Sequence, residues 1–229
     1  MLSGKVYVVY PPVKTRIFGR ILGFCLVSLS VAVLALNFWP AAKLEAVYRI
    51  KNLRKVTAVV DAGDLARTPS KFRLLLAQSD IEIVKPVNRD FGLVIPAIGV
   101  NTSVQANIDL ANEDNFQPIL TNGVAHGLGT SFPGQGGTIY IFGHSSDFGL
   151  DPTRQATFYL LDKLQEGEEI SIFYKNWRYI YRVSQKTIVK GDDMSFLQNN
   201  GEEKLVLQTC WPPNTRWYRL MIIAKPILT

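Results

Sequence analysis

Hydrophobic and polar positions follow three successive patterns along this chain, and the first is an uninterrupted apolar stretch. Residues 21–36 carry no charge, and with their flanks at 17–39 they reach the roughly 20 residues that a helix needs to cross a bilayer. We therefore predict a cytoplasmic leader at 1–16 and a transmembrane signal anchor at 17–39. A cleaved secretory signal is the alternative, although the apolar stretch is long for one. Either way, the rest of the chain is expected to be exported.

Beyond this stretch the hydrophobic pattern changes twice. Within residues 40–80, Leu44, Val47, Ile50 and Leu53 recur about once per helical turn, which predicts a juxtamembrane stalk of one or two helices. From about residue 81 the apolar residues form short runs rich in β-branched and aromatic side chains, separated by Gly, Pro, Asn and Asp. These runs lie at 93–96, around 104, and at 138–142, 170–174, 177–183, 187–189, 204–209 and 220–224.

Short strands with few helices indicate a barrel. Seven or eight strands, with one convincing helix expected at 157–164, imply a mainly antiparallel, closed or nearly closed β-barrel. Residues 174–177 are typical of a hairpin tip. The predicted fold class is therefore mostly β: a barrel at 81–229 with one or two short helices, preceded by a transmembrane helix and a helical stalk.

The formal net charge of +6 could suggest a nucleic-acid partner, but its distribution does not. Residues 1–80 carry 12 Lys+Arg against 4 Asp+Glu, whereas residues 81–229 carry 13 against 15. A nucleic-acid site would need the positive charge on the folded domain. The basic residues flank the apolar stretch instead, as in a membrane anchor. Those before it favour a cytoplasmic N-terminus, although five more follow at 43–55.

The chain offers two cysteines and two histidines for chemistry. Cys25 lies in the apolar stretch, so Cys-His chemistry in the exported part must use Cys210, at the end of an apolar strand. His144 follows Gly143 at the end of another strand, and Arg219 precedes the last one. A cysteine nucleophile needs a nearby cation, the leaving amine of an amide needs a proton donor, and an arginine can hold the oxyanion. The order His, Cys, Arg supplies all three.

Three blocks in this order resemble the sortases, which are membrane-anchored cysteine transpeptidases of the bacterial surface. The glycine-rich segment 123–137 is similar to the stretch leading into the family's histidine strand. Gly143-His144-Ser145 is followed at 158–170 by a stretch similar to the family's Leu-x-x-Leu-x-x-Gly-(Asp/Glu)-x-Ile. Leu207-Gln208-Thr209-Cys210 matches its Leu-x-Thr-Cys signature, with Arg219 opening the last strand. The resemblance covers about residues 90–226.

The resemblance implies a reaction and a role for each residue. Cys210 would attack the Thr–Gly carbonyl of a Leu-Pro-x-Thr-Gly-like sorting motif and form a thioacyl enzyme. His144 would protonate the departing amine and deprotonate the incoming one, Arg219 would position substrate and stabilise the oxyanion, and Thr209 would help to shape the pocket. The implied partners are secreted proteins bearing the motif, an amine acceptor such as a cell-wall precursor or a pilin lysine, and the membrane. No cofactor or metal is implied.

Rival residues exist for each role except that of the nucleophile. His126 lies in the glycine-rich loop, where related sortases often carry an unused histidine. Arg216 falls in the turn after Pro213, whereas Arg219 directly precedes the apolar strand. The acidic loop residues could suggest calcium, although acidic pairs in loops are usually solvated turns. These acidic residues are Asp192, Asp193, Glu202 and Glu203.

Alternative functions and subclasses fit the sequence less well. The stalk lacks the Asp-Pro-aromatic lid signature of pilus-polymerising sortases, and Asp151-Pro152 follows the histidine, which favours anchoring over polymerisation. L,D-transpeptidases expect a glycine directly before the cysteine, and papain-like proteases place Cys before His. A different class of alternative is a membrane-tethered, non-catalytic β-barrel that binds a peptide, with Cys210 as a packed core thiol.

Overall fold

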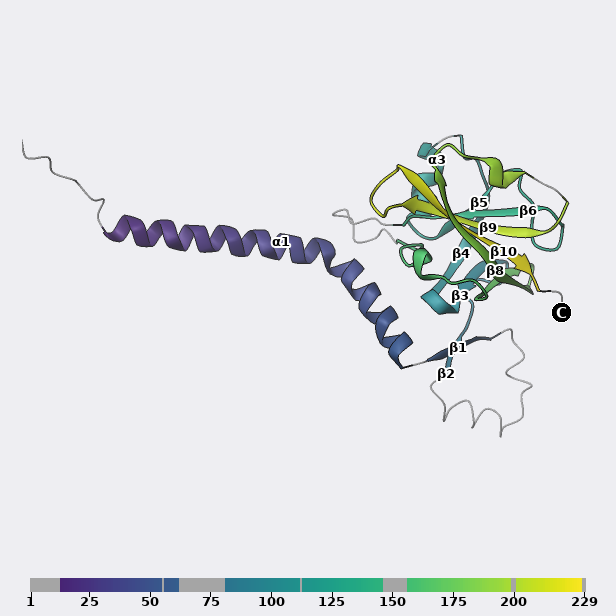
Figure 1. Cartoon of the computed structure of the whole chain (residues 1–229), viewed down its shortest axis with the longest axis horizontal. Helices are drawn as coiled ribbons and strands as arrows, with labels where there is room; N and C mark the ends of the chain where they lie inside the picture. The colour runs from purple at the N-terminus through teal and green to yellow at the C-terminus, as the bar shows by residue number, and fades with distance from the viewer. Residues whose placement is uncertain are drawn as a thin grey trace, which may run out of the picture. The chain divides into compact units, whose positions relative to one another are not determined.

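The computed structural model describes residues 13–54, 56–61, 81–111, 113–145, 156–198 and 201–227. The chain divides into two compact units, Met1–Pro40 and Ala41–Thr229. Helix α1 (Val13–Leu53) runs through both (Figure 1). In the part of the chain that is described, it is the one helix long and apolar enough to cross a membrane, and the mean hydropathy reaches 2.3 over an 18-residue stretch of it. This helix fits a membrane-anchored protein.

The predicted anchor and the first part of the predicted stalk form one helix. Pro40 lies inside α1, where a proline removes one backbone hydrogen bond. Good helix formers follow it directly, among them Ala41, Ala42 and Leu44, and the helix continues to Leu53. A second stalk helix, expected near 72–76, lies outside the described residues. The predicted boundaries at 17, 40 and 81 stay predictions.

A small parallel sheet follows α1 where helix was expected. Strand β1 (Thr57–Val60) pairs with β2 (Ile81–Val84) in register from Thr57 opposite Ile81 to Val60 opposite Val84. The helical expectation was wrong for β1, whose sequence Thr-Ala-Val-Val is rich in β-branched residues. Val60 packs against Val94 and Phe173, so this sheet contacts the barrel.

Eight strands form a closed barrel in the order β10-β8-β7-β3-β4-β5-β6-β9. The pairs β4–β5 and β6–β9 are parallel and the other neighbouring pairs are antiparallel, which confirms the predicted mainly antiparallel barrel. The strands are β3 (Phe91–Ile95), β4 (Val100–Ile108), β5 (Val124–Gly127), β6 (Thr138–Phe142), β7 (Glu169–Tyr174), β8 (Trp177–Lys190), β9 (Lys204–Trp211) and β10 (Tyr218–Pro226).

Two apolar clusters lie on opposite faces of the strands, because successive side chains alternate between faces. The main core fills the barrel and takes Ile139 and Ile141 from β6. The second, here called the outer cluster, lies on the outside of β6, β9 and β10. Its buried members are Leu120, Ala125, Tyr140, Phe142, Val206 and Met221, with Phe116, Ile119, Phe196 and Leu197 packed against them.

Two short helices cover the outer cluster. Helix α3 (Glu113–Leu120) places Phe116 edge-on to Phe142, with ring centroids 5.5 Å apart. The 3-10 helix η4 (Ser195–Leu197) places Phe196 against Tyr140, with centroids 5.1 Å apart. Helix α3 was not predicted, because it is short and carries Pro118 in its interior. The outer face of β6 and β9 is therefore partly sealed.

The connections confirm one local prediction and overturn another. Residues 174–177 form the expected hairpin tip, with Lys175 at φ 50° and Asn176 at φ 68°, as a type I′ turn requires. The helix expected at 157–164 is wrong: residues 157–160 form turns, and Leu161–Lys163 form the 3-10 helix η3. Its hydrogen bonds span three residues, as in Lys163 N–H to Leu160 O at 2.9 Å. A further 3-10 helix, η2, spans Pro96–Ile98.

Candidate active site

Cys210 and Arg219 lie opposite each other on neighbouring strands. In the antiparallel ladder of β9 and β10, Arg219 is the direct partner of Cys210. The next residues, Thr209 and Leu220, are buried, and Leu220 belongs to the main core, so Cys210 and Arg219 face outward. Cys210 is half-buried and free of any disulfide. Its thiol is thus available on the outer face of the barrel.

His144 reaches the same place from the other side of β9. Strands β6 and β9 run parallel, with Phe142 opposite Gln208. Gly143 continues this pairing, because its N–H donates to Gln208 O at 3.1 Å. Two residues beyond the Phe142–Gln208 pair, His144 is level with Cys210. His144 is half-buried. The strand pairing thus places His144 just after β6, Cys210 on β9 and Arg219 on β10, and β9 lies between β6 and β10.

Gly143 and Thr209 hold the histidine segment on β9. A Cβ atom at Gly143 would lie 2.9 Å from side-chain atoms of Phe158 and Val124, so a larger residue would force either these side chains or the backbone next to His144 to shift. The hydroxyl of Thr209 donates to Gly143 O at 2.8 Å, and Phe158 N–H donates to His144 O at 2.9 Å. Thr209 thus lies on the buried side of the strand, and it can shape the site by fixing the backbone before His144.

Arg219 is oriented by backbone carbonyls. Its Nη1 donates to Arg216 O at 3.1 Å and to Tyr218 O at 3.2 Å. Arg216 therefore supports the site through its carbonyl group, while its own side chain is exposed. Burial raises the pKa of the Tyr140 phenol, the Arg219 guanidinium opposes this shift, and Cys210 adds to it. Both side chains thus lie within electrostatic reach of the outer cluster.

His126, the rival histidine, points into the barrel. It is fully buried, stacks on Phe132 with ring centroids 4.5 Å apart, and lies edge-on to Phe91. Asn107 N–H donates to its Nδ1 at 3.4 Å, so its proton is on Nε2, 3.0 Å from Ser131 O. Burial lowers the pKa of His126 below 6.5, and the hydrogen bond to Ser131 opposes this shift. His126 is a neutral interior residue.

Acid is expected to destabilise the barrel through His126. Below about pH 6.5 the unfolded chain binds a proton at this imidazole while the folded chain resists it, so stability falls by up to about 1.4 kcal/mol per pH unit. Urea unfolding of the detergent-solubilised chain from about pH 7.5 to about pH 5 measures this loss. His126→Gln keeps an acceptor for Asn107 and a donor for Ser131, so its loss should be shallower. Equal slopes would contradict the prediction.

Two of the four acidic loop residues, Glu203 and Asp193, have hydrogen-bond partners within the protein. Glu203 accepts hydrogen bonds from Tyr181 Oη at 2.7 Å and from the N–H groups of Gly134 and Gly136 at 3.0 and 3.1 Å. Asp193 accepts the N–H of Ser195 at 2.9 Å. Among the residues with described positions, no group of three or more His, Cys, Asp or Glu could hold a metal ion. Glu203 fastens the start of β9 to the glycine-rich loop before β6.

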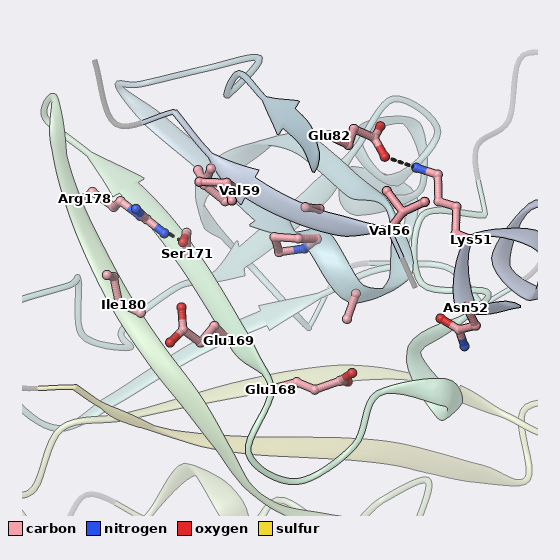
Figure 2. Close-up of a pocket in the computed structure, with 14 residues that line it drawn as sticks. Lys51, Asn52, Val56, Val59, Glu82, Glu168, Glu169, Ser171, Arg178 and Ile180 are labelled. Atoms are coloured by element: carbon pink, nitrogen blue, oxygen red, sulfur yellow. Dashed lines mark hydrogen bonds and ion pairs between the residues drawn. The ribbon is translucent and has the colours of Figure 1, made fainter. Parts of the chain in front are cut away.

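A separate cavity of about 630 Å³ lies elsewhere in the second unit (Figure 2). The end of α1, the β1–β2 sheet and the β7–β8 hairpin line it, and His144, Cys210 and Arg219 do not. Charged side chains that line it already have partners within the protein: Lys51 forms an ion pair with Glu82, and Arg178 donates a hydrogen bond to Ser171 Oγ at 3.1 Å. This cavity is not part of the candidate active site.

Sequence reasoning missed the residues that build the surface beside the thiol. The sequence places Tyr140 and Phe142 in the apolar run 138–142 but does not show which face they occupy; both are buried members of the outer cluster, with ring centroids 5.5 Å apart. A signal existed, because these aromatic residues alternate with Ile139 and Ile141 along one strand. Phe116 and Phe196 gave no such signal, since they lie on short helices that pack against the strands from distant parts of the chain.

Comparisons with known proteins agree on one family. A family model described as the Sortase domain matches residues 93–227. Sortase D of Bacillus subtilis (strain 168) is 28% identical over 94 residues, which are 41% of this chain and 43% of that protein, so the match spans less than half of the relative. Sortase C1 of GBS pilus island 1 is 27% identical with a TM-score of 0.51, covering 61% of this chain and 64% of that one. The pilus-related sortase C of group B Streptococcus is 27% identical with a TM-score of 0.52, covering 62% and 69%.

Proposed function

Because this chain belongs to the sortase family, we propose that it is a transpeptidase in which Cys210, His144 and Arg219 act together on a sorting motif similar to Leu-Pro-x-Thr-Gly. The observation that supports this most directly is the strand order. Strand β9, which carries Cys210, lies between β6, which His144 follows, and β10, on which Arg219 is the ladder partner of Cys210.

The proposed reaction has two half-reactions. The Cys210 thiolate attacks the carbonyl carbon of the motif's threonine, and Arg219 stabilises the resulting oxyanion. The C–N bond breaks as His144 donates a proton to the leaving amine, which leaves a thioester on Cys210. An acceptor amine then attacks the thioester while His144 takes its proton. The new amide forms and the thiolate is released, with no redox partner needed.

The substrates and location follow from the same proposal. The donors are secreted proteins that carry the motif, and the acceptor is an amine on a cell-wall precursor or a pilin lysine. Helix α1 supports a single-pass membrane anchor with a cytoplasmic N-terminus and an extracellular catalytic domain. The missing Asp-Pro-aromatic sequence in the stalk favours attachment of proteins to the cell wall over pilus polymerisation.

A thioacyl adduct on Cys210 would test the proposal directly. The detergent-solubilised chain is incubated with a library of Leu-Pro-x-Thr-Gly peptides and analysed by intact-mass and peptide mass spectrometry. We expect an adduct equal to the acyl part of one or more peptides, located on Cys210 and removed by hydroxylamine. No adduct with any peptide, under conditions in which Cys210 is reduced, would contradict the proposal.

Thiol reactivity separates the enzyme from a non-catalytic peptide-binding barrel. If His144 provides a cation beside the thiolate, iodoacetamide should label Cys210 rapidly, and His144→Ala should slow the labelling by about tenfold. A packed core thiol would react slowly in both proteins. Equal rates would favour the binding module, in which Cys210 has no activating partner.

A further inference from the structure

Gln208 lies beside Cys210 on the outward-facing side of β9. Their two-residue spacing puts both side chains on the same face. The next outward residue, Val206, is completely buried, whereas Gln208 and Cys210 are both half-buried. Gln208 is therefore the outward-facing residue of β9 that precedes Cys210 and remains accessible to solvent.

The neighbours of Gln208 are apolar. It pairs with Phe142 on β6 and with Met221 on β10, and both belong to the buried outer cluster. Phe116 packs against Phe142 from α3. The Gln208 amide has a C=O acceptor and an NH2 donor. Neither of its cross-strand partners, Phe142 and Met221, has a polar side chain that could pair with them.

The Gln208 amide is open to a ligand. Among the residues that the structure describes, its side chain takes part in no hydrogen bond. It is not sealed from water either, because in the same residues the one buried side-chain polar atom without a partner is Thr157 Oγ1. The amide nitrogen and oxygen of Gln208 thus reach solvent at the floor of the site, where a bound chain could replace water.

The acyl part of a substrate fits over Gln208 better than the acceptor does. The thioacyl segment must remain bound between the two half-reactions, so it needs a formed surface. That surface runs from Cys210 to Gln208, with α3 and η4 packed against the strands beyond it. In the other direction β9 ends at Trp211 and a turn begins, so β9 offers no further strand surface for the acyl segment there.

We propose that Gln208 selects the substrate by pairing with the backbone of the residue x that precedes the motif's threonine. The side-chain oxygen accepts the N–H of residue x, and the side-chain NH2 donates to its C=O group. Two residues of β9 span roughly 6.6 Å, and in an extended peptide the N–H of residue x lies between one and two residues, roughly 3 to 6.6 Å, before the threonine carbonyl, so the long Gln208 side chain can reach it. Pairing through the backbone would leave the side chain of x unrestricted. This inference rests on the proposed function.

Removing one hydrogen-bonding partner from each molecule tests the inference. Gln208→Met keeps the length of the side chain and removes its polar atoms. The substrate partner is a peptide in which lactic acid replaces alanine in Leu-Pro-Ala-Thr-Gly, so that an ester removes only the N–H of residue x. We expect Gln208→Met to lower kcat/KM for the amide peptide by about tenfold, and the ester to lower it similarly for the unaltered chain. The ester should cause little further loss in Gln208→Met.

Controls separate recognition from folding and from chemistry. Gln105, exposed on β4, provides the matched Gln105→Met variant, which should leave kcat/KM unchanged. Iodoacetamide labelling of Cys210 and the melting temperature should be the same in Gln208→Met as in the unaltered chain. The inference would be overturned if the losses in kcat/KM from Gln208→Met and from the ester multiplied when combined, or if Gln208→Met caused no loss. Either result would leave the proposed transpeptidase function standing. If the unaltered chain forms no adduct with any library peptide, the proposed function falls, and the inference falls with it.

Discussion

Cys210→Ala is expected to abolish transfer of a sorting-motif peptide to an amine, with a loss of at least about 10⁴-fold in turnover. Without Sγ no thioester can form, and no other described side chain beside His144 offers a comparable nucleophile: the next outward residue on β9 is Gln208, and the partner on β10 is Arg219. Because Cys210 is half-buried at the end of β9, its truncation should change the free energy of unfolding by less than about 1 kcal/mol.

Cys25→Ala is the matched control for this variant. Cys25 is exposed on α1, within the predicted membrane span, and belongs to the first unit. Its replacement should leave both the turnover and the thioacyl adduct unchanged. Residual turnover in Cys210→Ala above the uncatalysed rate would contradict the mechanism, and so would loss of activity in Cys25→Ala. A fluorescence-quenched peptide with an added amine measures both proteins under one set of conditions.

Arg219→Ala should lower kcat/KM by about 10² to 10³-fold, which is the usual effect of removing one donor to an oxyanion. Arg219 is the ladder partner of Cys210, and two backbone carbonyls fix its guanidinium before substrate binds. A preorganised donor of this kind needs no rearrangement as charge develops. Arg219→Lys should recover part of the rate, because it keeps the charge and loses the planar fork of donors.

Arg216→Ala is the matched arginine control. It removes an exposed side chain but retains the carbonyl group that accepts from Arg219 Nη1, so kcat/KM should stay within about threefold. Steady-state kinetics with the same peptide decide between the two arginines. A larger loss in Arg216→Ala than in Arg219→Ala would exchange their roles, and equal small losses would remove arginine from the mechanism.

The barrel could be predicted because most of its strands carry their own signal. The run 138–142 combines β-branched and aromatic residues, and similar runs recur at short intervals up to residue 224. Elements that depend on packing carried no such signal. Helix α3 is short and contains Pro118, and the apolar residues of 157–164 have helical spacing but pack against the core as a turn and a 3-10 helix. There, tertiary contacts override local propensity.

Sequence order supplied the candidate residues, but not the way they meet. The parallel pairing of β6 with β9 brings His144 level with Cys210, and a parallel register between distant segments leaves no mark on either strand. The same limit applies to Gln208 and Thr209. Both directly precede Cys210 in the sequence. Only the alternation of faces along β9 shows that Gln208 lies on the same face as the thiol, whereas Thr209 lies on the buried face and bonds the backbone before His144.

The parallel β6–β9 pairing also bears on when activity can appear. It joins segments 66 residues apart, and β9 and β10 follow every other described strand in the sequence. Contacts of such large sequence separation are slow to form, because a long loop must close first. In the proposed topology the N-terminus stays in the cytoplasm and the part of the chain after α1 crosses the membrane in sequence order, so it would present the imidazole well before the thiol. Cys210 would come next to its proton donor only once translocation is nearly complete. A partly translocated chain could therefore not form a thioacyl intermediate with other secreted proteins.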